Sequence, residues 1–351
     1  MELLRLGSSP DLGFDAHQMI DKFAYTDAVA VDSRSGAVIL GDPDSTIRAW
    51  YCAGKPLLSI VVGVLADQRK LAFDDRLHDL IGAAGWLGDA TLADLLSHGS
   101  GILEPDAVVA RGIPSSHRMQ WIETILTAPA PAHRPSYSTF VAWWLVGRIV
   151  EERTGTPMQR LLVDGLLEPY DVAPQDLWLH VTPSEFDGIA SRLVWNTDMV
   201  EGWPIPMLAE VCPPVVCDWN PGFGTYGTVE AMARVMAGVV GDLNGRGRAL
   251  TTETASRICS TVHRGLDSVL GRDAAYGMGV MTQLDVHGFG DRPSVGSVGA
   301  AGEGGLCWVV GDPSAEMAVA VHGRELVDPT RALGERRSST ATAIWDAVRP
   351  Q

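Results

Sequence analysis

The chain has 351 residues, of which 46% are hydrophobic and 20% are charged, and its formal net charge is -16. This composition supports a large buried core and excludes the disordered, collagen-like and low-complexity classes of protein. An acidic surface repels phosphate backbones and anionic headgroups, so we expect neither nucleic acid nor a membrane as a partner.

The N-terminal half of the chain predicts two strands followed by helices. Residues 27–40 read as two short strands around a Ser-Arg-Ser-Gly turn, and the apolar spacing of 55–68 predicts a helix that begins near Cys52. Pro56 fits only the first turn of that helix, because it lacks an amide hydrogen. Further helices are expected at 92–97, 117–126 and 140–154, and an ordered loop is expected at 203–221.

The C-terminal part of the chain returns to strands after a helix at 229–240. Strands are expected at 277–286, 306–311 and 315–323, and a closing helix is expected at 332–348. Strands at both ends predict one sheet assembled from both termini. We therefore expect a sheet domain made of 1–80 and 225–351, a helical insertion made of 81–224, and an active site in the cleft between them.

The cysteines and the N-terminus indicate a reduced, soluble protein. The five cysteines are irregularly spaced: Cys52, Cys212, Cys217, Cys259 and Cys307. An odd number without a CxxC pair is not a disulfide framework, and no His/Cys cluster has zinc-site spacing, so we expect no metal and no other cofactor. The N-terminal residues lack the pattern of a signal peptide, and no apolar run is long enough to cross a bilayer. We expect a cytoplasmic location.

The tetrad Cys52-Ala53-Gly54-Lys55 carries the strongest chemical signal. Residues three apart on a helix lie one above the other, so we expect the Lys55 ammonium near the Cys52 sulfur. The positive end of the helix dipole points at the same sulfur, and both effects favour thiolate over thiol. Only three of the 27 basic residues are lysines, which suggests a role here that arginine cannot fill, since arginine does not release its proton. The alternative is a buried structural cysteine beside a surface lysine.

Several segments resemble the serine β-lactamase and penicillin-binding protein superfamily, especially its class C β-lactamase and esterase branch. In that family Ser-x-x-Lys opens the central helix, and Cys-Ala-Gly-Lys stands in its place here. Similar segments follow in the family's order: LADQRKLAFDDRLHDLI, TLADLLSHGSGI, Tyr137-Ser138-Thr139, GTVEAMARV and AYGMGV. The resemblance runs from about residue 27 to 325. It implies an α/β (α+β) fold, a β-lactamase-like antiparallel sheet flanked by helices, with an inserted mainly helical domain.

The third family motif, Lys-Thr-Gly or His-x-Gly, has no basic residue in this chain. We place it at Ser297-Val298-Gly299, and a shifted register would place it at Ala300-Ala301-Gly302. The resemblance implies an oxyanion hole made by the backbone amides of Cys52 and Ala300. It also implies that Ser297 and Gly299 contact the substrate.

The resemblance gives Cys52, Lys55 and Tyr137 catalytic roles, with Lys55 and Tyr137 as proton carriers. It places Thr139 against the substrate, in the position of the family's asparagine. The aromatic residues Trp219 and Tyr226 lie in an irregular segment where cleft walls usually form, and we expect them to line the substrate site.

Two further features have ordinary interpretations. Residues 222–227, GFGTYG, fit the GxGxxG pattern but follow no strand, so we interpret them as a loop near the cleft and not as a dinucleotide site. His98 in the LLSHGSG stretch is interpreted as a hydrogen-bonded loop histidine.

The departures from the family pattern favour acyl transfer over β-lactam hydrolysis. The small residue in the third motif removes the anchor for the carboxylate that penicillins carry, so a typical β-lactamase is not expected. An acyl-cysteine is a thioester, which reacts with amines and thiols better than an oxygen ester does. We therefore expect an enzyme that passes an acyl group from a small-molecule or peptide-like substrate to an amine or hydroxyl acceptor in a biosynthetic pathway. The alternatives are a cysteine-dependent esterase or amidase and a catalytically degenerate binding protein.

Overall fold

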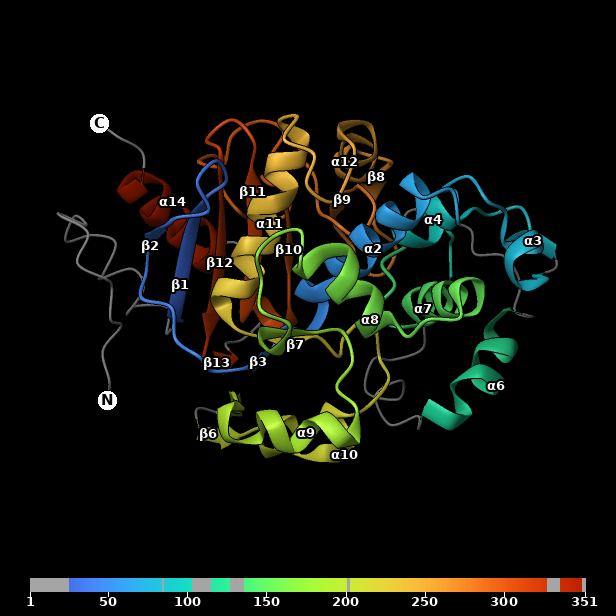
Figure 1. Cartoon of the computed structure of the whole chain (residues 1–351), viewed down its shortest axis with the longest axis horizontal. Coiled ribbons are helices and arrows are strands. Elements are labelled where there is room, and N and C mark those ends of the chain that lie inside the picture. Colours follow the sequence, from blue (N-terminus) through green and yellow to red (C-terminus); the bar gives the residue numbers. More distant parts are fainter. Residues whose placement is uncertain are drawn as a thin grey trace.

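The structure, a computed structural model, describes residues 25–83, 85–102, 115–126, 136–200, 203–326 and 335–348. Its central sheet has five antiparallel strands in the order β10-β11-β12-β1-β2 (Figure 1). These strands are β10 (Val298–Ala301), β11 (Cys307–Asp312), β12 (Met317–Gly323), β1 (Tyr25–Asp32) and β2 (Val38–Leu40). The prediction of one sheet built from both ends of the chain is confirmed.

The sheet is covered on both faces, and the alternation along β12 shows how. Ala318 and Ala320 pack into the main core cluster with α2 (Lys55–Asp67) and α11 (Val229–Leu243). Val319 and Val321 point to the opposite face, toward the cluster that contains Trp345 of α14 (Glu335–Val348). Since successive side chains of a strand point to opposite faces, a strand buried on both sides needs a continuous apolar run, which is the pattern of 317–321.

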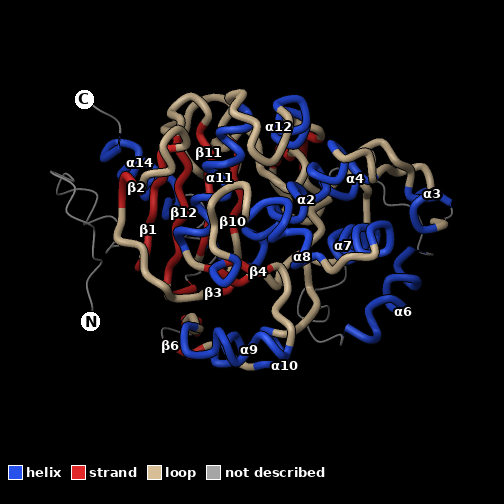
Figure 2. Tube along the Cα trace, in the orientation of Figure 1, coloured by secondary structure: helices blue, strands red, loops and turns tan. Residues whose placement is uncertain are grey.

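The other helices gather beside the sheet, as Figures 1 and 2 show. They are α3 (Leu77–Ile81), α4 (Leu92–Leu96), α6 (Ser115–Leu126), α7 (Val141–Thr154), α8 (Met158–Leu162), α9 (Pro183–Ile189), α10 (Pro213–Val216) and α12 (Thr252–Cys259). Gly155 ends α7 in the left-handed conformation, as its position after a long apolar segment predicts. None of the helices in the described ranges is long and apolar enough to span a membrane.

Small sheets join distant parts of the chain around the central helix. One consists of β3 (Arg48–Ala49), β7 (Tyr226–Gly227) and β4 (Leu177–Trp178). A second consists of β13 (Glu325–Leu326), β5 (Thr197–Val200) and β6 (Trp203–Pro206), and β8 (His263–Leu266) pairs with β9 (Asp273–Tyr276). The pairing of β3 with β7 brings the residues just before Cys52 against the end of the GFGTYG loop.

Two predicted segments differ from the structure. Residues 277–286 form no named strand, because Gly279 and Gln283 have positive φ, and only Met281 pairs with the neighbouring strands through isolated bridges. Residues 203–221 are not all loop, since they contain β6, a 3-10 turn at Leu208–Val211 and α10. The division of the chain near residues 80 and 225 into a sheet domain and a helical insertion stays a prediction.

Candidate active site

Cys52 lies on a tight turn that leads directly into the central helix. Tyr51–Gly54 form one turn of 3-10 helix, and α2 begins at Lys55 with Pro56 in its first turn. Side chains three apart eclipse on a 3-10 turn, so Cys52 and Lys55 share a face. Tyr51 has a φ of 48°, which is uncommon for a residue with a side chain, and such backbone strain concentrates at functional sites.

The Lys55 ammonium is fixed by two main-chain carbonyls from distant parts of the chain. Its Nζ donates to Thr139 O at 3.1 Å and to Gly222 O at 2.8 Å. It also lies 5.4 Å from the ring centroids of Tyr137 and Trp143. The side chain is buried, and its third N–H has no hydrogen-bond acceptor among the described residues. The structure therefore joins the turn, the Tyr137 segment and the GFGTYG loop at one amino group.

The Tyr137 ring is held by His98. The two rings stack with their centroids 4.4 Å apart, and Nδ1 of His98 accepts a hydrogen bond from the Ser138 amide at 3.0 Å. Burial lowers the pKa of His98 well below its ordinary value, and the nearby Lys55 charge acts in the same direction. His98 is a satisfied loop histidine, as expected, and its neutral ring also positions Tyr137.

Cys307 is the second cysteine near the turn, and it has a structural role. Cys307 lies on β11, and its Sγ donates a hydrogen bond to Trp50 O at a distance of 3.3 Å. Burial raises the pKa of Cys307 well above its ordinary value, and a charge on Cys52 would raise it further. This thiol therefore stays protonated beside Cys52.

The hairpin between β10 and β11 reaches the Cys52 turn at Gly302. A Cβ at this position would lie 2.8 Å from Trp50 O and 3.5 Å from Tyr51 Cβ. The Gly302 amide donates to Cys307 O, so this residue forms a hydrogen-bonded pair with β11. Because such pairs alternate along antiparallel strands, the Ala300 amide also points toward β11 and not toward the open edge.

This geometry does not fit the predicted oxyanion role of Ala300. The amides on the open edge of β10 belong to the alternate residues, and the amide of Gly299 on that edge is bonded to Met281 O. The remaining edge position within β10 is Ala301. The register that fits the turn is Ala300-Ala301-Gly302, because Gly302 is the residue that packs against Trp50 and Tyr51.

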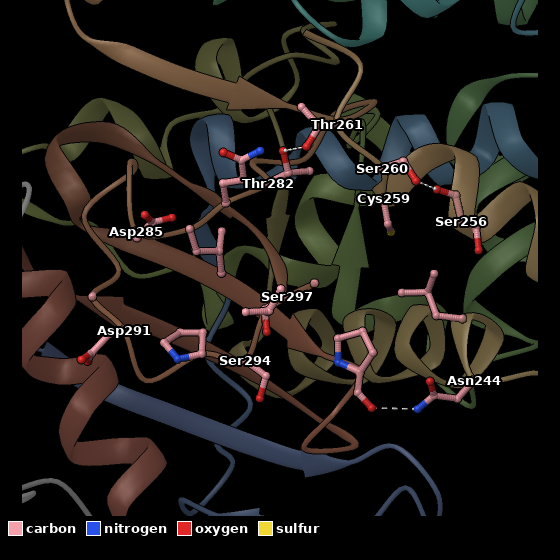
Figure 3. A pocket seen from close by; sticks show the side chains of 18 residues that line it. Asn244, Ser256, Cys259, Ser260, Thr261, Thr282, Asp285, Asp291, Ser294 and Ser297 are labelled. Atoms are coloured by element: carbon pink, nitrogen blue, oxygen red, sulfur yellow. Dashed lines mark hydrogen bonds between the residues drawn. The ribbon is translucent and has the colours of Figure 1, made fainter. Parts of the chain in front are cut away.

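Ser297, which we expected against the substrate, lies at the opposite end of β10 from Gly302. The four residues of β10 lie between the two, so the five steps of extended chain separate them by about 16 Å. Ser297 lines a different cavity of about 840 Å³, whose lining contains both polar and apolar side chains (Figure 3). Among these, the Thr261 and Thr282 hydroxyls bond to each other at 2.8 Å. Ser297 is thus away from the end of β10 that meets the turn, and both main-chain groups of Gly299 are bonded to Met281.

The other predicted substrate residues separate into two groups. Tyr226 lines a cavity of about 450 Å³ next to Tyr51, and its hydroxyl donates to Glu210 O at 3.1 Å. The Trp219 ring instead packs on α7 at Gly147. Thr139 lies beside Gly222, and its carbonyl is the group that meets Lys55.

Sequence reasoning missed three contributors to this site. The Gly222 carbonyl and the Gly302 hairpin act through the main chain, so residue type gives little signal. Glu210 was missed because nothing in its local sequence indicates burial. No cluster of three or more His, Cys, Asp or Glu residues suited to a metal occurs in the described ranges.

Comparison with known proteins places the chain in a family. The family profile described as Beta-lactamase matches residues 29–340. The chain belongs to the β-lactamase family. This membership confirms the predicted fold and the expectation of an enzyme of the hydrolase or acyltransferase class of this superfamily. No curated protein matches the chain in sequence.

Solved structures share this fold over nearly the whole chain. A penicillin-binding protein homologue from Caulobacter crescentus has 20% identity and a TM-score of 0.74, with 97% of this chain and 99% of that chain covered. EstCE1, described as a hydrolase with promiscuous acyltransferase activity, has 16% identity and a TM-score of 0.71, with coverage of 95% and 97%. A mutant of simvastatin synthase (LovD) from Aspergillus terreus has 15% identity and a TM-score of 0.67, with coverage of 94% and 93%.

Proposed function

We propose that this protein is an acyl-transfer enzyme in which Cys52 forms an acyl-thioester intermediate. The observation that carries the proposal is the convergence on the Cys52 turn of a fixed ammonium, Lys55, and a tyrosine ring, Tyr137. A decayed site would have no need to hold a buried ammonium with two carbonyl oxygens. Burying a charge costs free energy, which a site without a function would have no reason to maintain. This argues against a purely binding role.

The reaction has two balanced steps. The Cys52 thiolate attacks the carbonyl carbon of an ester or thioester donor, the sulfur–carbon bond forms, and the donor's alcohol or thiol leaves with a proton from Lys55 or Tyr137. An acceptor amine or hydroxyl then attacks the thioester carbon and gives its proton to the same pair, and Cys52 leaves as thiolate. The third N–H of Lys55 is the group available for this exchange.

The oxyanion of each tetrahedral intermediate needs two amide donors. The Cys52 amide is one, and we assign the second to the open edge of β10, at Ala301. The packing of Gly302 against Trp50 supports this choice, since it brings that edge to the turn. No side chain of the motif is required, so the loss of the family's basic residue leaves this part of the catalysis intact.

Hydrolysis is the second candidate. A family VIII carboxylesterase shares the fold at 18% identity with a TM-score of 0.74 over 98% of this chain and 100% of that one. A cysteine-dependent esterase or amidase would use the same first step with water as the acceptor. A cytoplasmic location and a biosynthetic role stay predictions from the sequence.

Intact-mass spectrometry tests the proposal. The protein is incubated with a p-nitrophenyl ester, an N-acetylcysteamine thioester and a penicillin, and then with an amine acceptor. We expect a single acyl adduct with the ester or thioester that is absent in Cys52→Ala and is released as an amide. The control is Cys212→Ala, which removes an exposed thiol and should keep the adduct. An adduct that survives in Cys52→Ala would refute Cys52 as the nucleophile, and release only as free acid would favour hydrolysis.

A further inference from the structure

The cavity of about 450 Å³ next to Tyr51 combines aromatic walls with a buried carboxyl group. Tyr51, the residue before Cys52, and Phe223 form one wall, with their ring centroids 5.0 Å apart. Tyr226 forms another part of the lining. Glu210, from the turn that precedes α10, lies in the same lining with a side chain only 6% exposed.

Glu210 has one satisfied and one unsatisfied oxygen. Its Oε2 accepts from the Asn196 amide at 2.9 Å and from Asn196 Nδ2 at 3.0 Å. Its Oε1 is buried and has no hydrogen-bond partner among the described residues. A buried carboxyl oxygen without a donor costs free energy. A ligand that donates a hydrogen bond to Oε1 would remove this cost.

The surrounding charges leave Glu210 uncompensated. Arg118 also lines the cavity, but its guanidinium is ion-paired with Asp218 and donates to Trp219 O. Burial raises the pKa of Glu210 to about 7, and the charge of Glu303 acts in the same direction. Above pH 7 the ionised Glu210 carboxylate is therefore an uncompensated negative charge in this cavity, and an anionic ligand would be repelled from it.

We infer that this cavity binds an ammonium group carried by the acyl donor. The inference rests on the proposed function, because it names the chemistry of the substrate that reaches Cys52 past Tyr51. The ammonium donates to Glu210 Oε1 and lies against the faces of Tyr51 and Phe223, which attract cations. The aliphatic part of the donor fills the apolar remainder of the cavity.

The binding test uses Cys52→Ala, so that no turnover is needed. Hexylammonium chloride and hexan-1-ol are titrated separately by isothermal calorimetry at pH 8. We expect hexylammonium to bind at least about tenfold more tightly than hexanol, and Glu210→Gln to remove the difference. Equal affinities of the two probes, or a preference that survives Glu210→Gln, would overturn the inference.

A matched pair of charge variants covers the case in which Glu210→Gln does not fold. Val215 lines the cavity and is 43% exposed, whereas Val262 is 39% exposed and lies outside its lining. Val215→Lys should weaken hexylammonium binding at least about tenfold, and Val262→Lys, with the same added charge, should not change it. An equal effect of both variants would show general electrostatics and reject the site. Binding without any acyl adduct on wild-type protein would refute the proposed function and leave the ammonium site standing.

Discussion

At the residue scale, the proposed proton transfer gives a reason for a lysine at position 55, in a chain where only three of the 27 basic residues are lysines. Two of its three N–H groups are occupied by Thr139 O and Gly222 O, so the ammonium has one direction left in which to act. A guanidinium is larger, planar and permanently protonated, and it could not exchange a proton from this position.

Lys55→Met should slow the alkylation of Cys52 by iodoacetamide about tenfold at neutral pH, because the thiolate is the reacting species and the ammonium attracts it. Peptide mass spectrometry over time gives the rate. Exposed Cys212 in the same sample is the internal control, and its rate should stay unchanged. The variant should also lose about 1–3 kcal/mol of unfolding free energy, because two carbonyls lose their donor. An unchanged Cys52 rate would show that Lys55 does not activate the thiol.

The residue scale also shows which parts of the site can be predicted from the amino-acid sequence. Cys52 and Lys55 are three positions apart, so their proximity follows from local helical geometry alone. Tyr137 could be found only through the resemblance, because 82 positions separate it from Lys55. Glu210 and the Gly222 carbonyl gave no signal, since their roles arise from tertiary contacts that bury one and expose the other to Lys55.

At the element scale, the hairpin between β10 and β11 depends on Gly302. An alanine there would place its Cβ against Cys307 Sγ and 2.8 Å from Trp50 O, so the hairpin must move away from the turn. We expect Gly302→Ala to reduce the rate of Cys52 acylation at least about tenfold, because the oxyanion amide moves with the strand. Stopped-flow acylation with a p-nitrophenyl ester measures this.

The control for Gly302→Ala is Gly188→Ala in α9. A Cβ at Gly188 meets nothing within 4 Å, and alanine is the better helix former. This variant should leave acylation unchanged and raise the unfolding free energy by about 0.5–1 kcal/mol. If Gly302→Ala acylates at the wild-type rate, the hairpin does not carry the oxyanion amide.

Elements with a strong periodic pattern were predictable, and the register of a motif was not. The helices α2 and α7 and strand β12 have apolar patterns that fix their type from local sequence. Along 297–302, by contrast, every residue is small, so neither Ser297-Val298-Gly299 nor Ala300-Ala301-Gly302 stands out. Only the hydrogen-bond alternation of β10 and the packing of Gly302 separate the two registers.

At the scale of the whole molecule, three buried histidines and Glu210 have displaced pKa values. As the pH falls, the histidines lower the unfolding free energy and Glu210 raises it. Burial lowers the pKa of His98 well below its ordinary value, that of His287 to about 4 and that of His322 to about 3. The unfolded chain protonates each below about 6.5, whereas the native state does not, so acid destabilises the fold through these histidines. Glu210 acts oppositely, because its native pKa of about 7 lies above its unfolded value and it stabilises the fold as the pH falls from 7 to 4.5.

Near pH 5.5 the unfolded chain therefore binds roughly two more protons than the native state at these four groups, so the unfolding free energy should fall by roughly 2.5 kcal/mol per pH unit. Urea titrations at pH 6.5, 6.0, 5.5 and 5.0 measure the slope. Glu210→Gln removes the opposing proton, so the slope should steepen to roughly 3.7 kcal/mol per unit. The steepening is specific to Glu210, because the three histidines are unchanged in both proteins. Parallel slopes in the wild type and Glu210→Gln would mean that Glu210 is ionised throughout this range, and that the cavity beside Tyr51 already holds its negative charge at pH 5.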